Sequence, residues 1–423
     1  MPPLRGAGAG VYQKRRREET THLHRILYVE DAPAVGGSAV CLEELVRGLD
    51  RSRFEPFVLF AYDLSARASL SSGGIPNATV ASILGMPEPV PPEEREPRLP
   101  RHKRTAPYRL LWSLKSYLRR DRKRAAMLAD WISRERFDLV HANNSLTGNL
   151  AAIVAGSRAG LPVVSHQRGY FRPTAFQRFA ARGIDRFLCV SGSVAEHYAE
   201  QGLRRDRILT VHDGIDVARL APRSRAARSR PLIGWAGRLV AWKGASLLVS
   251  AAETALSRGA DADFIVAGEG PELPGLRERI DGSKLLRDRF RCVGFRSDAR
   301  DLIAECDVFV NTSIEPEPFS HSALEATALG VALVAPACGG LPEIVAHGAS
   351  GLLFETGDAR ALAGALEKLI GDPGARTRFG MEGRRRAERL FSLERHVAAI
   401  EAVYDSLFGS SGGGHGRGPL TRP

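Results

Sequence analysis

The 423-residue sequence predicts an α/β fold with two doubly wound, parallel-sheet domains. The chain exceeds the size at which one hydrophobic core keeps growing, so two domains are expected. Short apolar or β-branched runs alternate with helical patterns along its length. This alternation occurs twice, and a basic, proline-broken gap over residues 216–231 separates the two occurrences.

Each half supplies six predicted strands, which are short and rich in β-branched or apolar residues. In the amino-terminal half they are RILYVE (25–30), PFVLFA (56–61), DLVHA (138–142), PVVSH (162–166), RFLCVS (186–191) and RILTV (207–211). In the carboxy-terminal half they are LIGWAG (232–237), DFIVAG (263–268), RFRCVGF (289–295), DVFVNT (307–312), VALVAP (331–336) and GLLF (351–354). Because such sheets bind ligands at the carboxyl ends of their strands, a shared ligand would lie in the cleft between the domains.

The predicted domain boundaries follow from this alternation and from composition. In chain order the segments are a disordered basic tail (1–22), an amino-terminal domain (23–215), a linker (216–231), a carboxy-terminal domain (232–390), a closing helix (391–408) and a disordered glycine-rich tail (409–423). The two tails are too polar or too rich in glycine to bury a core. The closing helix is expected to pack back on the amino-terminal domain.

With 43% apolar and 26% charged residues, the composition is that of an ordinary soluble globular protein. No apolar run approaches the ~20 residues that a membrane-spanning helix needs. Residues 1–20 lack the apolar core of a signal peptide, so we expect a cytoplasmic protein. The five cysteines are scattered without a CxxC pair, which argues against a disulfide framework or a zinc site.

The net charge of +12 predicts acidic partners, and much of the positive charge lies in residues 98–124. This segment carries eleven Lys or Arg residues against the single Asp121. Apolar residues recur in it at helical spacing, at Tyr108, Leu111, Trp112, Leu114 and Leu118. Such a helix can rest on the anionic inner face of the cell membrane, or it can dock on its own domain with a solvated cationic face. The sequence contains no recognisable standard nucleic-acid-binding module, so nucleic acid is not an expected partner.

The stretch IEPEPFSHSALEATALG, at residues 314–330, places two carboxylates in different settings. Two prolines keep the segment around Glu317 out of a helix, so Glu317 is predicted in a loop after a strand. Glu325 is predicted in the second turn of the following helix. The helix N-terminus over residues 320–322 presents unpaired amides that suit a phosphate. Carboxylates beside a phosphate suit sugar hydroxyls, so a nucleotide sugar would satisfy both kinds of group.

Five motifs in the carboxy-terminal half resemble a retaining glycosyltransferase of family four, the group 1 glycosyltransferases with the GT-B fold. They are GRLVAWKG (237–244), GEGP (268–271), the E-x7-E pair of Glu317 and Glu325, GG-L-PEIV (339–345) and GxxGLLF (348–354). The amino-terminal half resembles the family more weakly, through Gly36 and Gly37, HANNSLTG (141–148), PVVSHQRG (162–169), VSGSVAEHY (190–198) and DGID (213–216). The resemblance implies two Rossmann-like domains that face a central cleft, with the acceptor on the amino-terminal side.

The resemblance also implies roles for the carboxy-terminal residues. Arg238 and Lys243 would pair with the donor diphosphate and stabilise the charge that develops on the leaving group. Glu325 would accept hydrogen bonds from the ribose, and Glu317 from hydroxyls of the transferred hexose. Further donor contacts are implied for Phe319, Ser320, His321 and Ser322 at the distal phosphate, for Gly268, and for Gly294 and Phe295 at the nucleobase.

On the amino-terminal side, Gly36 and Gly37 would let the first loop approach the phosphates or the acceptor without a side-chain clash. His166 matches the position where family members place a histidine near the sugar. Two departures from the family pattern stand out. Ser320 replaces the second glycine of E-G-F-G, and Asp213 replaces the asparagine of the interdomain NGxD motif.

The implied reaction moves a hexose, with retention of configuration, from a nucleotide-diphosphate sugar to a hydroxyl of a glycan or lipid-linked acceptor, such as a cell-surface polysaccharide precursor. No carboxylate is plainly placed as a nucleophile. The acceptor hydroxyl would attack on the face that the diphosphate leaves, and the diphosphate would take the proton. No metal or other cofactor is expected, because Asp261 and Asp263 precede their strand at its amino end.

Three alternative functions compete with sugar transfer. A dinucleotide-dependent oxidoreductase is disfavoured, because APAVGGSA lacks the GxGxxG spacing after its strand. A catalytically inactive subunit that binds a sugar nucleotide or serves as a scaffold stays open, although it would be expected to lose one of the four charged site residues. A nucleotide-sugar epimerase of the same architecture also stays open.

Overall fold

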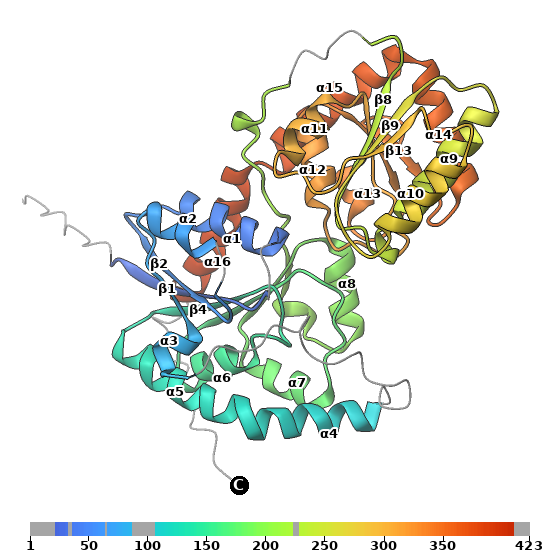
Figure 1. The fold of residues 1–423 in the computed structure, drawn as a ribbon. Coiled ribbons are helices and arrows are strands. Elements are labelled where there is room, and N and C mark those ends of the chain that lie inside the picture. The colour runs from blue at the N-terminus through green and yellow to red at the C-terminus, as the bar shows by residue number, and fades with distance from the viewer. Residues whose placement is uncertain (1–21, 33–35, 64–65, 87–105, 223–227, 410–423) are drawn as a thin grey trace, which may run out of the picture.

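The computed structural model describes residues 22–32, 36–63, 66–86, 106–222 and 228–409. It confirms the predicted fold class, since all strand pairs are parallel and form two sheets with helices on both faces (Figure 1). All twelve predicted strands are present. The predicted disordered tails lie outside the described residues, except for His22 and Gly409.

The amino-terminal sheet has seven strands in the order β3-β2-β1-β4-β5-β6-β7. Its strands are β1 (His24–Glu30), β2 (Phe54–Phe60), β3 (Asn77–Thr79), β4 (Leu139–Asn143), β5 (Val163–Gln167), β6 (Arg186–Cys189) and β7 (Ile208–Thr210). Sequence analysis missed β3, because a three-residue strand with the sequence NAT has neither the length nor the apolar pattern that signals a strand.

Helices cover both faces of this sheet (Figure 1). The described helices are α1 (Gly37–Gly48), α2 (Ala66–Ser72), α3 (Val80–Leu84), α4 (Ala106–Ser116), the π-helical η3 (Tyr117–Asp121), α5 (Arg122–Arg134), α6 (Leu150–Arg158), α7 (Ala175–Ala180) and α8 (Gly192–Glu200), with 3-10 turns η4 (Ala181–Gly183), η5 (Arg205–Arg207) and η6 (Val217–Arg219). One core lies between the sheet and α1, α2 and the last helix. A second core lies between the other face and α5, α6 and α8.

The carboxy-terminal sheet has six strands in the order β10-β9-β8-β11-β12-β13. Its strands are β8 (Leu232–Ala236), β9 (Asp263–Ala267), β10 (Phe290–Cys292), β11 (Val308–Val310), β12 (Ala332–Pro336) and β13 (Gly351–Phe354). Its helices are the 3-10 turn η7 (Ala241–Lys243), α9 (Ala245–Ser257), α10 (Leu273–Gly282), α11 (Ala299–Glu305), α12 (His321–Ala328), α13 (Leu341–Ile344), α14 (Ala359–Gly371) and α15 (Pro373–Leu390). Two apolar cores, one on each face, hold the layers together.

The last helix, α16 (Leu393–Gly409), lies against the amino-terminal sheet rather than the carboxy-terminal one (Figure 1). The chain returns through a bridge between Ile215 and Ser392. Tyr404 is fully buried, and its hydroxyl lies 2.9 Å from the Tyr28 hydroxyl and 2.6 Å from Nδ1 of His141. The helix therefore supplies both apolar and polar contacts to the core of the other domain.

The carboxyl edges of the two sheets face each other. Glu343 lies on α13, after β12, and its carboxylate accepts hydrogen bonds from the backbone N–H groups of Gly192 and Ser193 at 3.0 and 3.2 Å. Those two residues begin α8, after β6. The same carboxylate lies 2.7 Å from Nε2 of His212, which follows β7. The loops that bind ligands in such sheets therefore meet between the two lobes.

Candidate active site

Lys243 and Glu317 form an ion pair between two strand ends of the carboxy-terminal domain. Lys243 ends η7, after β8, while Glu317 lies in the loop after β11. The Glu317 carboxylate also accepts hydrogen bonds from Nδ2 of Asn311 at 2.7 Å and from Oγ of Ser313 at 2.9 Å. Only 6% of the Glu317 side chain is exposed, so this carboxylate is held in one orientation.

The charge of Glu317 is fixed by these partners. Burial by itself would raise the pKa of the carboxyl group, but Lys243, Asn311 and Ser313 outweigh it and hold the pKa below its ordinary value of 4.5. Glu317 is therefore ionised at neutral pH. It can accept hydrogen bonds from hydroxyl groups, but it cannot donate a proton.

The N-terminus of α12 lies beside this pair. Ser320 caps the helix, because its hydroxyl accepts a hydrogen bond from the backbone N–H of Ala323 at 3.4 Å. Nδ2 of Asn311 donates to the same hydroxyl at 3.0 Å, and Oγ of Ser322 lies 3.5 Å away. The residue that departs from the family pattern thus builds a helix N-cap. The phenyl ring of Phe319 packs 5.4 Å from the His212 ring of the amino-terminal domain.

Glu325 is buried one turn further along α12 and is engaged by a cation. Nε of Arg300, on α11, donates to its carboxylate at 2.5 Å. Arg300 also lies 3.6 Å from the carboxylate of Glu44, on α1 of the amino-terminal domain. Nε2 of His321 approaches Glu325 to 3.8 Å. The predicted ribose-binding carboxylate is therefore joined through Arg300 to the opposite domain.

The other donor-side residues lie at neighbouring strand ends. Arg238 is exposed, and no residue in the described part of the chain forms an ion pair with its guanidinium. The backbone N–H of Gly268 donates to the Gly294 carbonyl at 2.7 Å. A Cβ atom on Gly268 would lie 1.8 Å from the Gly237 carbonyl oxygen, so Gly268 permits β8 and β9 to end in contact. Phe295 is 69% exposed, which leaves its ring free to stack on a base.

On the amino-terminal side, Gly36 and Gly37 begin α1, and a Cβ atom at either position would meet no atom within 4 Å. Both glycines therefore border open space. His166 is buried at the end of β5, and its ring lies 5.5 Å from that of His141 and 6.2 Å from that of His396. Burial, reinforced by nearby Arg168, lowers the pKa of His166 well below 6.5, so its imidazole is neutral.

Sequence reasoning did not single out a buried ion pair between Arg168 and Asp213. Arg168 also donates from Nε to Oδ1 of Asn143 at 3.0 Å. Burial by itself would raise the pKa of Asp213, but Arg168 holds it below its ordinary value. Asp213 is the residue that replaces the family's asparagine, so the HQRG and DGID motifs together carried a signal for this pair. Glu343 lies in the GG-L-PEIV motif but was not singled out, and Arg300 gave no comparable signal.

The described histidine, cysteine and acidic side chains that lie close enough together to share a metal ion are His22, His24 and Asp138. They lie where β1 begins and before β4, at the amino edge of the sheet. That edge is opposite to the one that carries the residues above.

Comparison with known proteins identifies the family. The model described as glycosyl transferases group 1 matches residues 218–386, and that described as glycosyltransferase family 4 matches residues 35–219. The 2-deoxystreptamine N-acetyl-D-glucosaminyltransferase of Streptomyces fradiae is 30% identical over 316 residues, which cover 66% of this chain and 68% of that protein. The alpha-maltose-1-phosphate synthase of Mycolicibacterium smegmatis is 28% identical over 305 residues, which cover 62% and 77%.

Solved structures share the architecture. HepE of Anabaena, in complex with UDP, superposes with a TM-score of 0.70 at 22% identity, covering 90% of this chain and 100% of that one. Sucrose-phosphate synthase of Thermosynechococcus elongatus also gives a TM-score of 0.70, at 18% identity, covering 92% and 100%. The chain belongs to the group 1, family 4 glycosyltransferases and has their GT-B fold. It is a glycosyltransferase.

Replacing Lys243 by alanine should destabilise the protein by about 3 kcal/mol at pH 7, because it leaves the buried Glu317 charge unpaired. The difference should shrink as the pH falls through about 4.5. Burial raises the pKa of Glu317 in the variant, so its unpaired carboxyl group is already protonated near pH 4.5. The wild type loses its stabilisation only as the pH falls through the depressed pKa of Glu317, below 4.5. Urea unfolding at pH 7 and pH 4.5 measures both effects.

The exposed Lys368→Ala variant on α14 is the matched control, and it should unfold like the wild type at both pH values. A Lys243→Ala penalty that is independent of pH would show that Glu317 is not the group left unpaired.

Proposed function

We propose that this glycosyltransferase moves a hexose, with retention of configuration, from a nucleotide-diphosphate hexose to a hydroxyl of a glycan or lipid-linked acceptor, without a metal ion. The observation that carries the proposal is the buried Lys243–Glu317 pair beside the N-terminus of α12. At this place the Lys243 cation and the Glu317 carboxylate, which can bind hydroxyls, lie beside the free backbone amides at the start of α12. A diphosphate joined to a sugar presents the complementary groups.

The identities of several relatives support this donor class. HepE of Anabaena binds UDP and UDP-glucose. A further relative is the lipopolysaccharide core mannosyltransferase LpsB of Rhizobium meliloti, which is 29% identical over 266 residues and shares 59% of this chain and 74% of that protein. UDP is therefore the first nucleotide to test. The lipopolysaccharide relative favours an acceptor from a cell-surface polysaccharide.

Each charged residue has a role in the proposed reaction. Lys243 and the exposed Arg238 stabilise the charge that grows on the diphosphate as the glycosidic bond breaks. Glu317 accepts hydrogen bonds from hydroxyls of the hexose, and Glu325 from the ribose. Backbone amides between Phe319 and Ser322 hold the distal phosphate.

The proposed stereochemical course follows from how Glu317 is held. Lys243, Asn311 and Ser313 already direct three hydrogen bonds at its carboxylate, which favours a binding role over nucleophilic attack. In the proposed course, the acceptor oxygen bonds to the anomeric carbon on the face that the diphosphate leaves. The hydroxyl proton passes to the departing phosphate oxygen, and configuration is retained.

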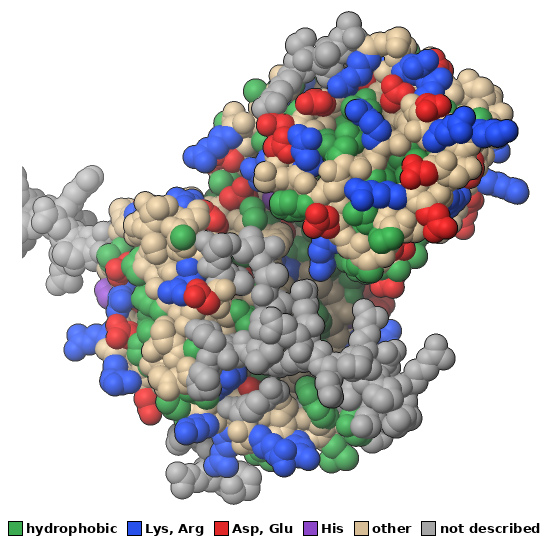
Figure 2. Space-filling view, in the orientation of Figure 1, with side chains coloured by type: hydrophobic (Ala, Val, Ile, Leu, Met, Phe, Trp, Pro, Cys, Tyr) green, Lys and Arg blue, Asp and Glu red, His purple; other side chains and the backbone are tan. Residues whose placement is uncertain are grey.

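We also propose that α4, η3 and α5 rest on the anionic cytoplasmic surface of a membrane. The domain covers the apolar surface of α4 and η3 only in part, since Leu111, Trp112, Leu114 and Leu118 are 66%, 50%, 37% and 54% exposed, whereas the apolar residues of α5 are buried in the core. Lys and Arg side chains gather along the same rim of the lower lobe (Figure 2). Residues 98–105 of the basic segment lie outside the described residues. Within the described ranges, no helix is long and apolar enough to cross a membrane.

UDP, GDP and ADP should be compared by thermal shift, and the nucleotide of the true donor should raise the melting temperature by mass action. Glu325→Ala should lose most of this shift, because the ribose hydroxyls lose their buried acceptor. Glu367→Ala is the matched control, because Glu367 is a partly exposed carboxylate on α14 that pairs with the surface residue Arg258. A full shift in Glu325→Ala would refute the ribose role.

Arg238→Ala should slow donor turnover about 10²- to 10³-fold, because it removes a stabilising charge from the leaving group. The measurement is nucleotide release from UDP-glucose, UDP-galactose and GDP-mannose, with water or methyl glycosides as acceptors. Arg258→Ala, an exposed arginine at the end of α9, should keep wild-type rates. Undiminished turnover in Arg238→Ala would contradict the proposed mechanism, and absence of turnover in the wild type would favour a binding subunit.

The wild type should co-sediment with vesicles of phosphatidylserine but not of phosphatidylcholine, and added salt should weaken the binding. Leu111→Ser combined with Leu118→Ser should reduce binding, since it removes apolar side chains that enter the interface. Leu209→Ser, an exposed leucine on β7, is the control. Equal sedimentation of all three proteins would refute the membrane contact.

A further inference from the structure

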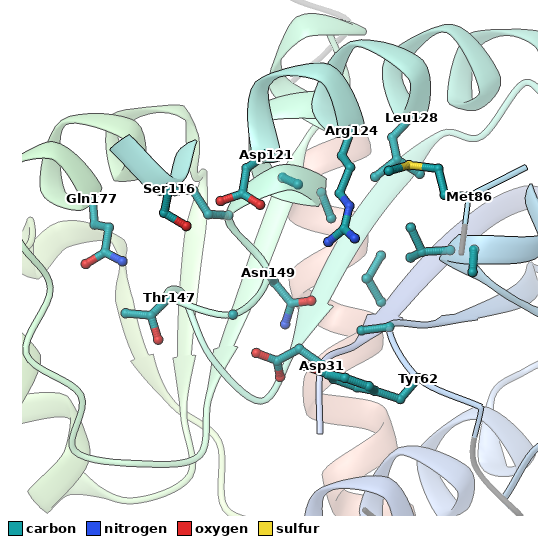
Figure 3. Close-up of a pocket in the computed structure, with 18 of the residues that line it drawn as sticks. Asp31, Tyr62, Met86, Ser116, Asp121, Arg124, Leu128, Thr147, Asn149 and Gln177 are labelled. Carbon is teal, nitrogen blue, oxygen red and sulfur yellow. The ribbon is translucent and has the colours of Figure 1, made fainter. Parts of the chain in front are cut away.

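A cavity of about 270 Å³ opens at the carboxyl edge of the amino-terminal sheet, apart from the donor-side residues (Figure 3). Asp31, directly after β1, and Thr147, Gly148 and Asn149, after β4, form its floor. Helices α3, α5 and α6 and the end of α4 enclose it. Because this edge faces the carboxy-terminal domain, a ligand in the cavity lies on the acceptor side of the site.

Asp31 is the principal polar group of the floor. Its carboxylate accepts hydrogen bonds from Nδ2 of Asn144 at 2.7 Å and from Oγ of Ser145 at 2.8 Å. A Cβ atom on Gly148 would lie 1.4 Å from this carboxylate, so glycine is required there for Asp31 to take its position. Burial, assisted by the neighbouring Glu30, raises the pKa of Asp31 to about 7. The chain therefore holds a desolvated carboxyl group in an open cavity.

The opposite wall carries a cation. Figure 3 shows the Arg124 guanidinium reaching from α5 toward Asn149 and the floor. Nε of Arg124 is buried and has no hydrogen-bond partner among the described residues. Nδ2 of Asn149 donates to the backbone oxygen of Ser145 at 3.3 Å, which fixes its amide at the cavity floor. Donors and acceptors therefore converge on the same space from two walls.

The remaining lining is apolar or aromatic. It includes Tyr62, Val80, Met86, Trp112 and Leu128. Trp112 comes from α4, and half of its surface is exposed. A sugar ring presents hydroxyls around its rim and C–H groups on its faces, so it matches a cavity with convergent polar groups and apolar walls.

We propose that this cavity binds one neutral sugar residue of the acceptor, with its hydroxyls on Asp31, Asn149 and Arg124. This inference rests on the proposed function and names its acceptor subsite. The volume of about 270 Å³ lies just below the about 300 Å³ at which sites for larger small molecules begin, so it suits a single ring. A phosphate group is a poorer match, because the carboxylates of Asp31 and Asp121 both line the cavity.

The probes are methyl α- and β-glycosides of glucose, galactose and mannose, added to the full-length protein. Saturation-transfer NMR measures their binding, and calorimetry with UDP, GDP and ADP measures nucleotide binding separately. We expect at least one glycoside to bind the wild type. Ala61→Phe places a ring in the cavity and should abolish that signal while nucleotide affinity stays unchanged, which also shows that the variant is folded.

At pH 8.5, above the raised pKa of Asp31, Asp31→Asn should weaken glycoside binding about ten-fold, because it replaces a charged acceptor by a neutral amide. Asp130→Asn, an exposed carboxylate on α5, is the matched control and should bind like the wild type. Glycoside binding by Ala61→Phe at wild-type strength would overturn the inference, as would absence of glycoside binding in a wild type that binds a nucleotide. If none of the three nucleotides binds the wild type, the result counts against the proposed donor class and not against the acceptor cavity.

Discussion

The candidate site depends on one constraint, which is that the buried carboxylate of Glu317 must keep its charge. Lys243, Asn311 and Ser313 come from two strand ends to meet it, and together they offset the cost of removing that charge from water. Asn311 also supports the hydroxyl of Ser320, so the carboxylate and the N-cap of α12 are positioned by one amide group. The loop between β11 and α12 therefore acts as a single rigid unit.

Charge pairing also determines how the two domains meet. Glu343 receives backbone donors from the start of α8, while Arg300 lies between Glu325 and Glu44. These contacts connect residues at the carboxyl edges of the two sheets. The same edges carry Lys243, Glu317 and the cavity beside Asp31, so under the proposed function the position of one domain on the other would set the distance between donor and acceptor.

The repeating strand pattern predicted the fold class and twelve of the thirteen strands, because each of those strands is apolar and bounded by turn residues. The sequence could have predicted the pairing of Lys243 with Glu317, since both residues stand at strand ends in recognisable motifs. The sequence could not have predicted Arg300 as the partner of Glu325, because Arg300 lies on a helix whose local sequence is like that of any solvent-exposed helix. The buried Arg168–Asp213 pair joins residues 45 positions apart, so periodicity does not predict the contact, and only the two motifs that hold these residues point to it.

The closing helix has a consequence for how the chain reaches its final structure. Tyr404 completes a core that contains Tyr28 of β1, 376 residues earlier. The part of this sheet face that α1 and α2 do not cover therefore stays exposed until α16 has left the ribosome. The carboxy-terminal domain has all its strands together in sequence, so it can form first and deliver α16 to its partner. The amino-terminal domain is therefore synthesised first, but its core is completed after that of the carboxy-terminal domain.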